Sequence, residues 1–199
     1  MAPQRKTFPR LFLARPEPFR LTGDKVYLRP AERGDFEEWA NLRARSRDFL
    51  TPWEPTWPSD ALSRPNFRAR IARYAEDWRT DQGYNFFIFR ADDALVGGVG
   101  LSNVRRGVAE TASLGYWVGA PFARQGMMTA ALPLVLDFAF DRLRLHRVEA
   151  ACLPINVPSR ALLVRTGFQQ EGYARNYLLI DGKWQDHLLF AILREDWRG

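Results

Sequence analysis

Apolar residues recur along the chain at two spacings, and these spacings predict helices and strands. Between residues 67 and 78 they recur at helical intervals, at Phe67, Ile71, Tyr74, Ala75 and Trp78. This pattern predicts an amphipathic helix that buries one face against the rest of the domain.

A second apolar stretch with helical spacing begins just after Gly126. Its periodic positions are Leu132, Val135, Leu136, Ala139 and Leu143. Pro133 lies inside this predicted helix, where it removes one backbone hydrogen bond and disfavours helical geometry at the preceding residue. Either the helix is kinked at Pro133, or its regular part starts later in the chain.

Seven segments rich in β-branched and aromatic residues predict strands. They are Lys25–Pro30, Tyr84–Arg90, Leu95–Ser102, Leu114–Gly119, His146–Leu153, Tyr173–Ile180 and Trp184–Leu193. Short turns join the second, third and fourth of them, which predicts an antiparallel meander. Asp181-Gly182 predicts a tight hairpin between the last two strands.

Two more helices and a loop complete the predicted order. Asp35 and Glu38 resemble a capping box, and the helix that follows would bury Phe36, Trp39 and Leu42. Residues 49–58 form a loop rich in Pro and Trp. Residues 160–166 form a helix that Gly167 ends as a C-terminal cap. The order β-α-α-β-β-β-α-β-α-β-β predicts a single α/β domain with a mixed sheet.

Length and composition agree with one well-packed domain. The chain has 199 residues, of which 46% are hydrophobic, and two full domains would each be small. No apolar run is long enough to span a membrane, and Asp137 interrupts the best candidate. Because Cys152 is the single cysteine, no internal disulfide can form, and we expect a reducing, cytoplasmic location. His146 and His187 lack the acidic or Cys neighbours of a metal site, so no metal is expected.

The first 20 residues differ from the rest of the chain in charge. The whole chain carries a net charge of +6, and this arm holds five basic residues against Glu17 alone. Its four prolines disfavour an amphipathic helix, so we separate an arm, residues 1–20, from a domain, residues 21–199. The arm is either a solvated, partly extended segment or an electrostatic contact with an acidic surface or with RNA, for example on a ribosome.

The segment Leu114–Thr129 is the strongest candidate for binding a ligand. It consists of a strand, a loop punctuated by Pro121 and Gly126, and the start of a helix. The free N–H groups and the dipole of a helix N-terminus attract phosphate, and Arg124 adds a positive charge. An ordinary connection between a strand and a helix has the same pattern, so both interpretations stay open on these residues alone.

With this order of elements, several motifs resemble those of GNAT-type N-acetyltransferases, and most closely those of the RimJ/RimL type, the ribosomal-protein-alanine N-acetyltransferases. The resemblance covers about residues 21–197 and leaves the arm unexplained. The last motif below, which runs on to Trp184 and Asp186, is the most specific and indicates the RimJ side. The motifs are Phe49-Leu-Thr-Pro-Trp-Glu-Pro55, Ser102-Asn-Val-Arg-Arg-Gly107, Leu114-Gly-Tyr116, Gly126-Met-Met-Thr129, His146-Arg147 and Glu171-Gly-Tyr-Ala-Arg-Asn-Tyr-Leu-Leu-Ile-Asp-Gly182.

The resemblance implies a mostly antiparallel central sheet that is splayed between its fourth and fifth strands, with acetyl-CoA in the gap. The pantetheine would lie along the backbone like an added strand, and the next loop would hold the pyrophosphate. The family pattern there is Gln/Arg-x-x-Gly-x-Gly/Ala; Gly126 matches its central glycine, whereas Ala123 and Met128 depart from it. The implied cofactor-binding residues are Tyr116, Trp117, Val118, Arg124, Gln125, Gly126, Met127, Met128, Thr129, Asn156 and Ser159.

Acetyl transfer from a thioester to an amine requires a neutral amine, a stabiliser for the oxyanion and a proton for the leaving thiolate. The resemblance implies that Ser159 protonates the thiolate; a helix N-cap is the structural alternative for this residue, and both roles can hold at once. The sequence shows no obvious base, since Leu178 stands where the RimL type has an acidic residue. A peptide α-amine has a pKa near 8, so about a tenth of it is already neutral at pH 7 and demands little from a base.

Three carboxylates remain as candidates for the base. Glu54 lies in the Trp-rich loop and either binds or deprotonates the amine, or is a surface residue. Glu110 enters the fourth strand near the expected gap, and Glu149 is equally compatible with a structural ion pair to an Arg. Trp53 and Trp57 either wall the acceptor site or pack the loop. We expect Cys152 to be a buried strand residue and not a nucleophile.

The main functional hypothesis is an enzyme that acetylates the N-terminal α-amine of a protein, in particular of a ribosomal protein. An alternative is an enzyme that acetylates a small amine, such as an antibiotic or a polyamine. A third is an acyl-CoA-binding or ribosome-docking module without turnover. Steady-state release of CoA with a set of N-terminal peptides distinguishes these three hypotheses.

Overall fold

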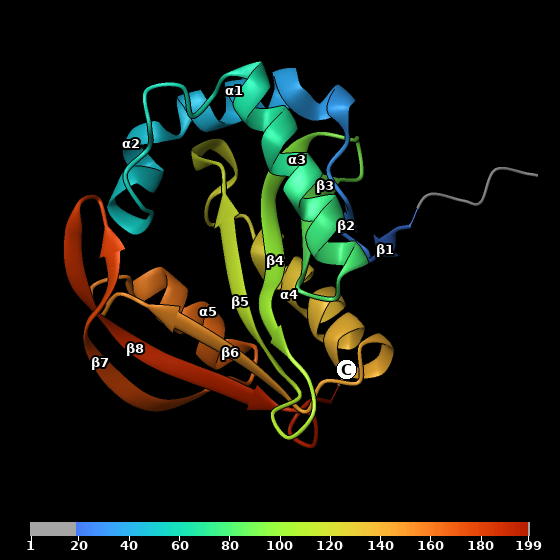
Figure 1. Cartoon of the computed structure of the whole chain (residues 1–199), viewed down its shortest axis with the longest axis vertical. Helices are drawn as coiled ribbons and strands as arrows, with labels where there is room; N and C mark the ends of the chain where they lie inside the picture. Colours follow the sequence, from blue (N-terminus) through green and yellow to red (C-terminus); the bar gives the residue numbers. More distant parts are fainter. Residues whose placement is uncertain (1–18, 199) are drawn as a thin grey trace, which may run out of the picture.

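The computed structural model describes residues 19–198. Within that range eight strands form one sheet in the order β1-β2-β3-β4-β5-β6-β8-β7 (Figure 1). The β5–β6 pair is parallel, and the other neighbouring strands are antiparallel. The strands are β1 Leu21–Thr22, β2 Val26–Arg29, β3 Gly83–Arg90, β4 Leu95–Arg105, β5 Thr111–Val118, β6 Arg147–Cys152, β7 Gln169–Ile180 and β8 Lys183–Leu193.

The helices are divided between the two faces of the sheet. One face packs against α1 and α3 in a cluster that includes Trp39, Leu42 and Phe67. The other face packs against α4 and α5 in a larger cluster that includes Leu132 and Leu163. The helices are α1 Phe36–Arg45, α2 Arg47–Leu50, α3 Arg64–Arg79, α4 Met127–Asp137 and α5 Val157–Arg165.

Strand β3 shows why the predicted strands are so apolar. Its alternate residues Phe87 and Phe89 face the α1 and α3 side, whereas Phe86 and Ile88 face the α4 side. Successive side chains of a strand point to opposite faces, so a strand covered on both faces is apolar nearly throughout. The mixed α/β fold predicted from the sequence is therefore confirmed, with one short strand, β1, that the pattern did not predict.

Because β1 precedes the first predicted strand, the fourth and fifth predicted strands are β5 and β6. These two strands pair only from Thr111 opposite Arg147 to Ser113 opposite Glu149, and β5 then continues to Val118 paired with β4 alone. Figure 1 shows the two strands diverging from their paired ends. The predicted splay is confirmed, and it leaves the last part of β5 without a strand on its β6 side.

The predicted capping box lies one turn earlier than expected. Glu32 and Asp35 form it, around a short 3₁₀ turn that precedes α1. Asp35 is buried and also accepts two hydrogen bonds from Arg29, at 2.9 and 2.6 Å. Glu38 instead accepts a hydrogen bond from the backbone N–H of Leu95, at 2.6 Å. The prediction was wrong because a long-range partner on β4 captures the Glu38 carboxylate.

Helix α4 contains Pro133 in its interior, which excludes a helix that starts only after this residue. The helix begins at Met127 and runs through Pro133 to Asp137, so its regular part does not start later. A π-helical turn, Phe138–Arg142, then follows. Pro133 cannot donate to the carbonyl of Thr129 one turn earlier, and Thr129 is exposed, where water can hydrate that carbonyl.

The end of the basic arm packs on the domain. The ring of Phe19 lies 5.2 Å from the ring of Trp78 and 5.6 Å from that of Phe138, between centroids. The guanidinium of Arg20 lies 3.3 Å from the ring centroid of Tyr27. The other residues of the predicted arm, 1–18, lie outside the described residues, as does the contact with RNA that we predicted for them. In the described part of the chain, no helix has the length and apolarity needed to cross a membrane.

Candidate active site

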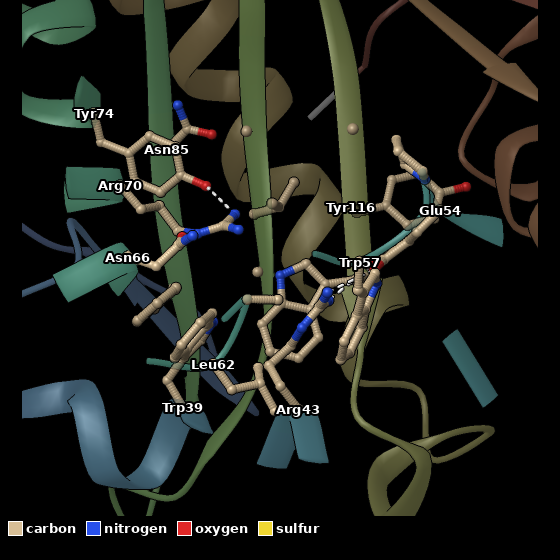
Figure 2. Close-up of a pocket in the computed structure, with 18 of the residues that line it drawn as sticks. Trp39, Arg43, Glu54, Trp57, Leu62, Asn66, Arg70, Tyr74, Asn85 and Tyr116 are labelled. Carbon is tan, nitrogen blue, oxygen red and sulfur yellow. Dashed lines mark hydrogen bonds and ion pairs between the residues drawn. The ribbon is translucent and has the colours of Figure 1, made fainter. Parts of the chain in front are cut away.

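A cavity of about 470 Å³ lies over β3, β4 and β5, on the face that α1 and α3 cover. We call it the central cavity. Its walls come from α1, α3 and the loop of residues 54–62, and its floor from the three strands (Figure 2). Tyr116, on the part of β5 that borders the gap toward β6, is among the residues that line the central cavity.

Glycines on the floor make room for the central cavity. Gly98, Gly100 and Gly115 line it. A Cβ atom on Gly100 would lie 2.4 Å from Oδ1 of Asn85, and one on Gly98 would lie 2.5 Å from Nε1 of Trp117. A Cβ on Gly115 would meet no atom within 4 Å and would project into open space. This floor was not predicted from the sequence, because glycines inside a strand otherwise indicate a bulge or a weakened strand.

Glu54 lies in the wall of the central cavity, in a dense set of contacts. Arg43 donates to both of its carboxylate oxygens, at 2.7 and 2.6 Å, and Nε1 of Trp57 donates at 2.8 Å. The guanidinium of Arg43 also stacks between the rings of Trp57 and Trp117, at 4.1 and 4.8 Å from their centroids. A carboxylate has about four lone-pair positions, so these three donors leave about one for another partner.

The loop that carries Glu54 is tied to the C-terminal hairpin. The backbone N–H of Asp181, in the turn between β7 and β8, donates to the carbonyl of Glu54 at 3.0 Å. Of the two tryptophans predicted either to wall the acceptor site or to pack the loop, Trp57 lines the central cavity and Trp53 is not among its lining residues.

On the face of the sheet that α4 and α5 cover, the hydroxyls of Tyr116 and Ser159 form a hydrogen bond. Oη of Tyr116 and Oγ of Ser159 lie 2.8 Å apart, which joins the free part of β5 to the first turn of α5. Burial raises the pKa of Tyr116 to about 12, so its hydroxyl stays protonated at neutral pH. The backbone N–H of Ser159 donates to Oδ1 of Asn156 at 3.2 Å, so Asn156 is the N-cap of α5 and the Ser159 hydroxyl is not used for capping.

Cys152 lies buried near this pair of hydroxyls. Burial raises the pKa of its thiol, which keeps the thiol neutral and therefore weakly nucleophilic. The prediction of a buried strand residue at this position is confirmed, since Cys152 ends β6.

The predicted phosphate cradle lies where β5 leads into α4. Gly126 is the N-cap of α4 with a φ of 78°, a conformation that favours glycine. Met127 and Met128 are buried in the core, so their backbone N–H groups, and not their side chains, are available to a ligand. The glycine and the unpaired part of β5 therefore fit an extended ligand that ends in phosphate groups.

Lys25 adds a positive charge to this cradle. Its Nζ lies 3.7 Å from the position that a Cβ on Gly126 would take. Lys25 could not be predicted from the sequence, because it lies 101 positions before Gly126 and only the packing of β2 beside α4 brings the two residues together. Arg124, with a φ of 61°, is exposed, and Nε2 of Gln125 donates to the carbonyl of Pro121 at 2.7 Å.

The structure does not bring the other two candidate bases to the central cavity. Glu110 precedes β5 at its paired end, where it accepts from the N–H of Gly107 at 2.8 Å and from Arg106 at 3.2 Å. Glu149 pairs with Arg147 at 2.9 Å and with Arg105 at 3.4 Å, which confirms the structural ion pair considered for it. Among residues 19–198, no group of three or more His, Cys, Asp or Glu is arranged to hold a metal ion.

Comparison with known proteins agrees with this geometry. Residues 25–169 match the family model described as "Acetyltransferase (GNAT) domain". The chain is 40% identical over 177 residues to the "Probable N-acetyltransferase YjcK" of Bacillus subtilis (strain 168), which covers 88% of this chain and 98% of the relative. It is 35% identical over 179 residues to the "[Ribosomal protein uS5]-alanine N-acetyltransferase" of Escherichia coli (strain K12), with coverages of 89% and 92%.

Among solved structures, Mycobacterium smegmatis RimJ in complex with CoA-disulfide superposes with a TM-score of 0.86 at 34% identity, covering 92% of this chain and 91% of RimJ. The family model covers more than half of the chain, and the fold, the splayed strands and the glycine before α4 agree with it. The sequence resemblance is therefore confirmed, and the chain belongs to the GNAT acetyltransferase family.

Proposed function

We propose that this acetyltransferase moves the acetyl group of acetyl-CoA to the N-terminal α-amine of a protein, and that this protein is ribosomal. The observation that carries the proposal is the arrangement of two sites that share strand β5. The gap beside β5 suits an extended thioester, and the central cavity over β5 suits the amine. Relatives whose names specify acetylation of ribosomal-protein alanine support this acceptor.

The chain offers a group for each part of acetyl-CoA. The free backbone of Tyr116, Trp117 and Val118 would bind the pantetheine as an added strand. The N–H groups from Arg124 to Thr129, with the ammonium of Lys25, would bind the pyrophosphate. When bound, acetyl-CoA supplies a thioester whose C–S bond breaks as the new C–N bond forms.

Two protons must move in this reaction, one from the amine and one to the thiolate. We assign the second to Ser159, whose hydroxyl is free of capping and bonded to Tyr116. The Tyr116 hydroxyl, which stays protonated at neutral pH, orients Ser159, and the proton lost by the acetylated amine replaces the one that Ser159 gives up. Asn156 holds Ser159 in position through the backbone of α5.

We assign Glu54 to the amine. Its one open lone-pair position accepts a hydrogen bond from the substrate ammonium or amine and so orients it. Strong proton abstraction is not needed, since about a tenth of a peptide α-amine is neutral at pH 7. Arg43 and Trp57 hold the carboxylate in place.

Steady-state release of CoA tests this function. We expect release with a peptide that begins with alanine and has a free α-amine. We expect none with the same peptide acetylated at its N-terminus, or with a lysine side chain as its sole amine. Equal release with a polyamine would favour the small-amine alternative, and no release with any amine would favour a binding module without turnover.

Two further expectations from the sequence stay proposals. A contact of the basic arm with ribosomal RNA predicts that loss of residues 1–18 weakens cosedimentation with ribosomes at low salt but leaves acetylation of a free peptide intact. The single cysteine supports a reducing, cytoplasmic compartment. Cell fractionation tests the location.

A further inference from the structure

Arg70 presents a positive charge to the central cavity without an acidic partner. It lies on the inner side of α3 and lines the cavity (Figure 2). One of its terminal nitrogens donates to Oη of Tyr74 at 3.3 Å, and its Nε is buried without a hydrogen-bond partner. No carboxylate of residues 19–198 forms an ion pair with it.

Arg43, in the same cavity, provides the contrast. Its Nε is buried without a partner like that of Arg70, but its charge is compensated by both oxygens of Glu54. Arg43, Glu54 and Arg70 are the charged residues among those that line the cavity, so the lining carries one uncompensated positive charge. Arg70 is partly buried, and its guanidinium lies 5.5 Å from the ring centroid of Trp39. Partial removal of a charge from water without an acidic partner costs free energy, which a ligand with a negative charge would recover.

The surroundings of Arg70 are those of a site for a carboxylate. Asn66 and Tyr74 lie one turn before and one turn after it on α3, and Asn85 lies opposite on β3. Figure 2 shows the guanidinium of Arg70 directed into the cavity, with these polar side chains around it. A guanidinium offers several donors in a planar fork, which matches the two oxygens of a carboxylate.

The register of the sheet gives the distance from Asn85 on β3 to the part of β5 beside which the amine would be acetylated. Asn85 on β3 pairs with Gly100 on β4, and Gly100 pairs with Gly115 on β5. Two strand spacings of about 4.8 Å separate β3 from β5, about 10 Å in all. An extended peptide covers about 3.3 Å per residue, so about three residues bridge the two strands.

We propose that Arg70, with Tyr74 and Asn85, forms an anion-binding subsite that selects an acidic side chain within the first four residues or so of the acceptor polypeptide. This inference rests on the proposed function. It adds a preference for an acidic residue near the N-terminus of the acceptor, which acetylation of a free α-amine does not by itself require. A polycationic acceptor would be repelled by the same charge.

Matched peptides test the subsite. Each begins with alanine and carries one Glu at position 2, 3 or 4, and its control has Gln at that position. With the wild-type enzyme we expect kcat/KM to be about tenfold higher for Glu than for Gln at one of these positions, as for a hydrogen bond to a charged group. In Arg70→Gln we expect this ratio to fall to about one, and in Arg70→Lys to an intermediate value, because the charge is kept and the fork is lost.

Arg68→Gln is the matched control, since Arg68 is on the same helix but exposed and outside the cavity lining. It should keep the wild-type ratio, and melting temperatures should verify that every variant is folded. Wild-type turnover without any preference for Glu, or a preference that survives in Arg70→Gln, would overturn the subsite and leave the proposed function intact. No turnover with any peptide would overturn the proposed function, and the subsite with it.

Discussion

At the scale of single residues, the hydrogen bond between the hydroxyls of Tyr116 and Ser159 is the contact most directly linked to chemistry. We expect Ser159→Ala to lower kcat on the order of 10²-fold, the usual contribution of a positioned proton donor. The KM for acetyl-CoA should change much less, because the role proposed for the hydroxyl is at the departing thiolate. Steady-state kinetics with varied acetyl-CoA measures both constants.

Ser159→Thr keeps a hydroxyl at the same place and serves as the control, with most of kcat retained. Because Asn156 caps α5, neither substitution removes the cap. If Ser159→Ala kept its turnover while its melting temperature fell, the hydroxyl would be a structural link between β5 and α5 and not a proton donor.

Glu54 gives a second prediction at this scale. Glu54→Gln should raise the KM for the acceptor peptide while leaving the affinity for acetyl-CoA unchanged, since the donor gap is built from other segments. If Glu54 only orients the amine, the defect should be similar at pH 7 and above pH 8. If it is the base, the loss should shrink as pH rises past about 8, where the α-amine is already neutral.

The matched control is Glu110→Gln, which removes a carboxylate outside the central cavity. Its kinetic constants for the peptide should equal those of the wild type. Wild-type kinetics in Glu54→Gln as well would remove Glu54 from the acceptor site and leave a chain of water molecules as the route for the proton.

At the scale of elements, local patterns predicted most of the strands and helices, because each depends on the spacing of apolar residues within one segment. The helix of residues 64–79 and the hairpin at Asp181-Gly182 agree with the prediction. The capping box did not, because Glu38 bonds to β4, which is remote in sequence. The roles of Lys25, Arg70 and the glycine floor were not predicted for the same reason. Each depends on contacts with an element that is remote in sequence.

The glycine floor of the central cavity can be tested by a substitution that places a side chain in the open space above it. Gly115→Val should raise the KM for the acceptor peptide by about tenfold or more, because the new side chain would occupy open space over the floor. Valine is favourable in a strand, so the melting temperature should not fall. Affinity for acetyl-CoA, measured by calorimetry, should be close to that of the wild type.

Gly100→Ala is the contrasting variant on the same floor. Its Cβ would lie 2.4 Å from Oδ1 of Asn85, so we expect loss of stability together with weaker peptide binding. Unaltered peptide kinetics in Gly115→Val would show that the acceptor does not occupy the cavity above β5.

At the scale of the whole molecule, the buried Tyr84 and the partly buried Tyr116 make the free energy of unfolding depend on alkaline pH. Burial raises the pKa of both Tyr84 and Tyr116 to about 12, from an ordinary value of 10.0. Between pH 10 and 12 the unfolded chain has lost these protons and the folded chain has kept them. The folded state then binds more protons, so its stability falls as pH rises through this window and is unaffected by these groups below it.

Urea unfolding at a series of pH values measures this dependence. The double variant Tyr84→Phe and Tyr116→Phe should lose less stability than the wild type between pH 10 and 12. Tyr177→Phe, at an exposed residue of β7, is the control and should follow the wild type. Identical slopes in the double variant and the wild type would contradict the assignment to these two tyrosines.

The place of β8 in the sheet also sets a condition on biosynthesis. This strand comes last in the described sequence, yet it lies between β6 and β7 and pairs with both. A nascent chain that lacks it would expose an edge of β6, open to pairing with other chains. It would also lack the hairpin partner that positions the contact of Asp181 with the loop of Glu54. Translation must therefore reach the end of β8 before the chain can both acetylate a substrate and resist aggregation.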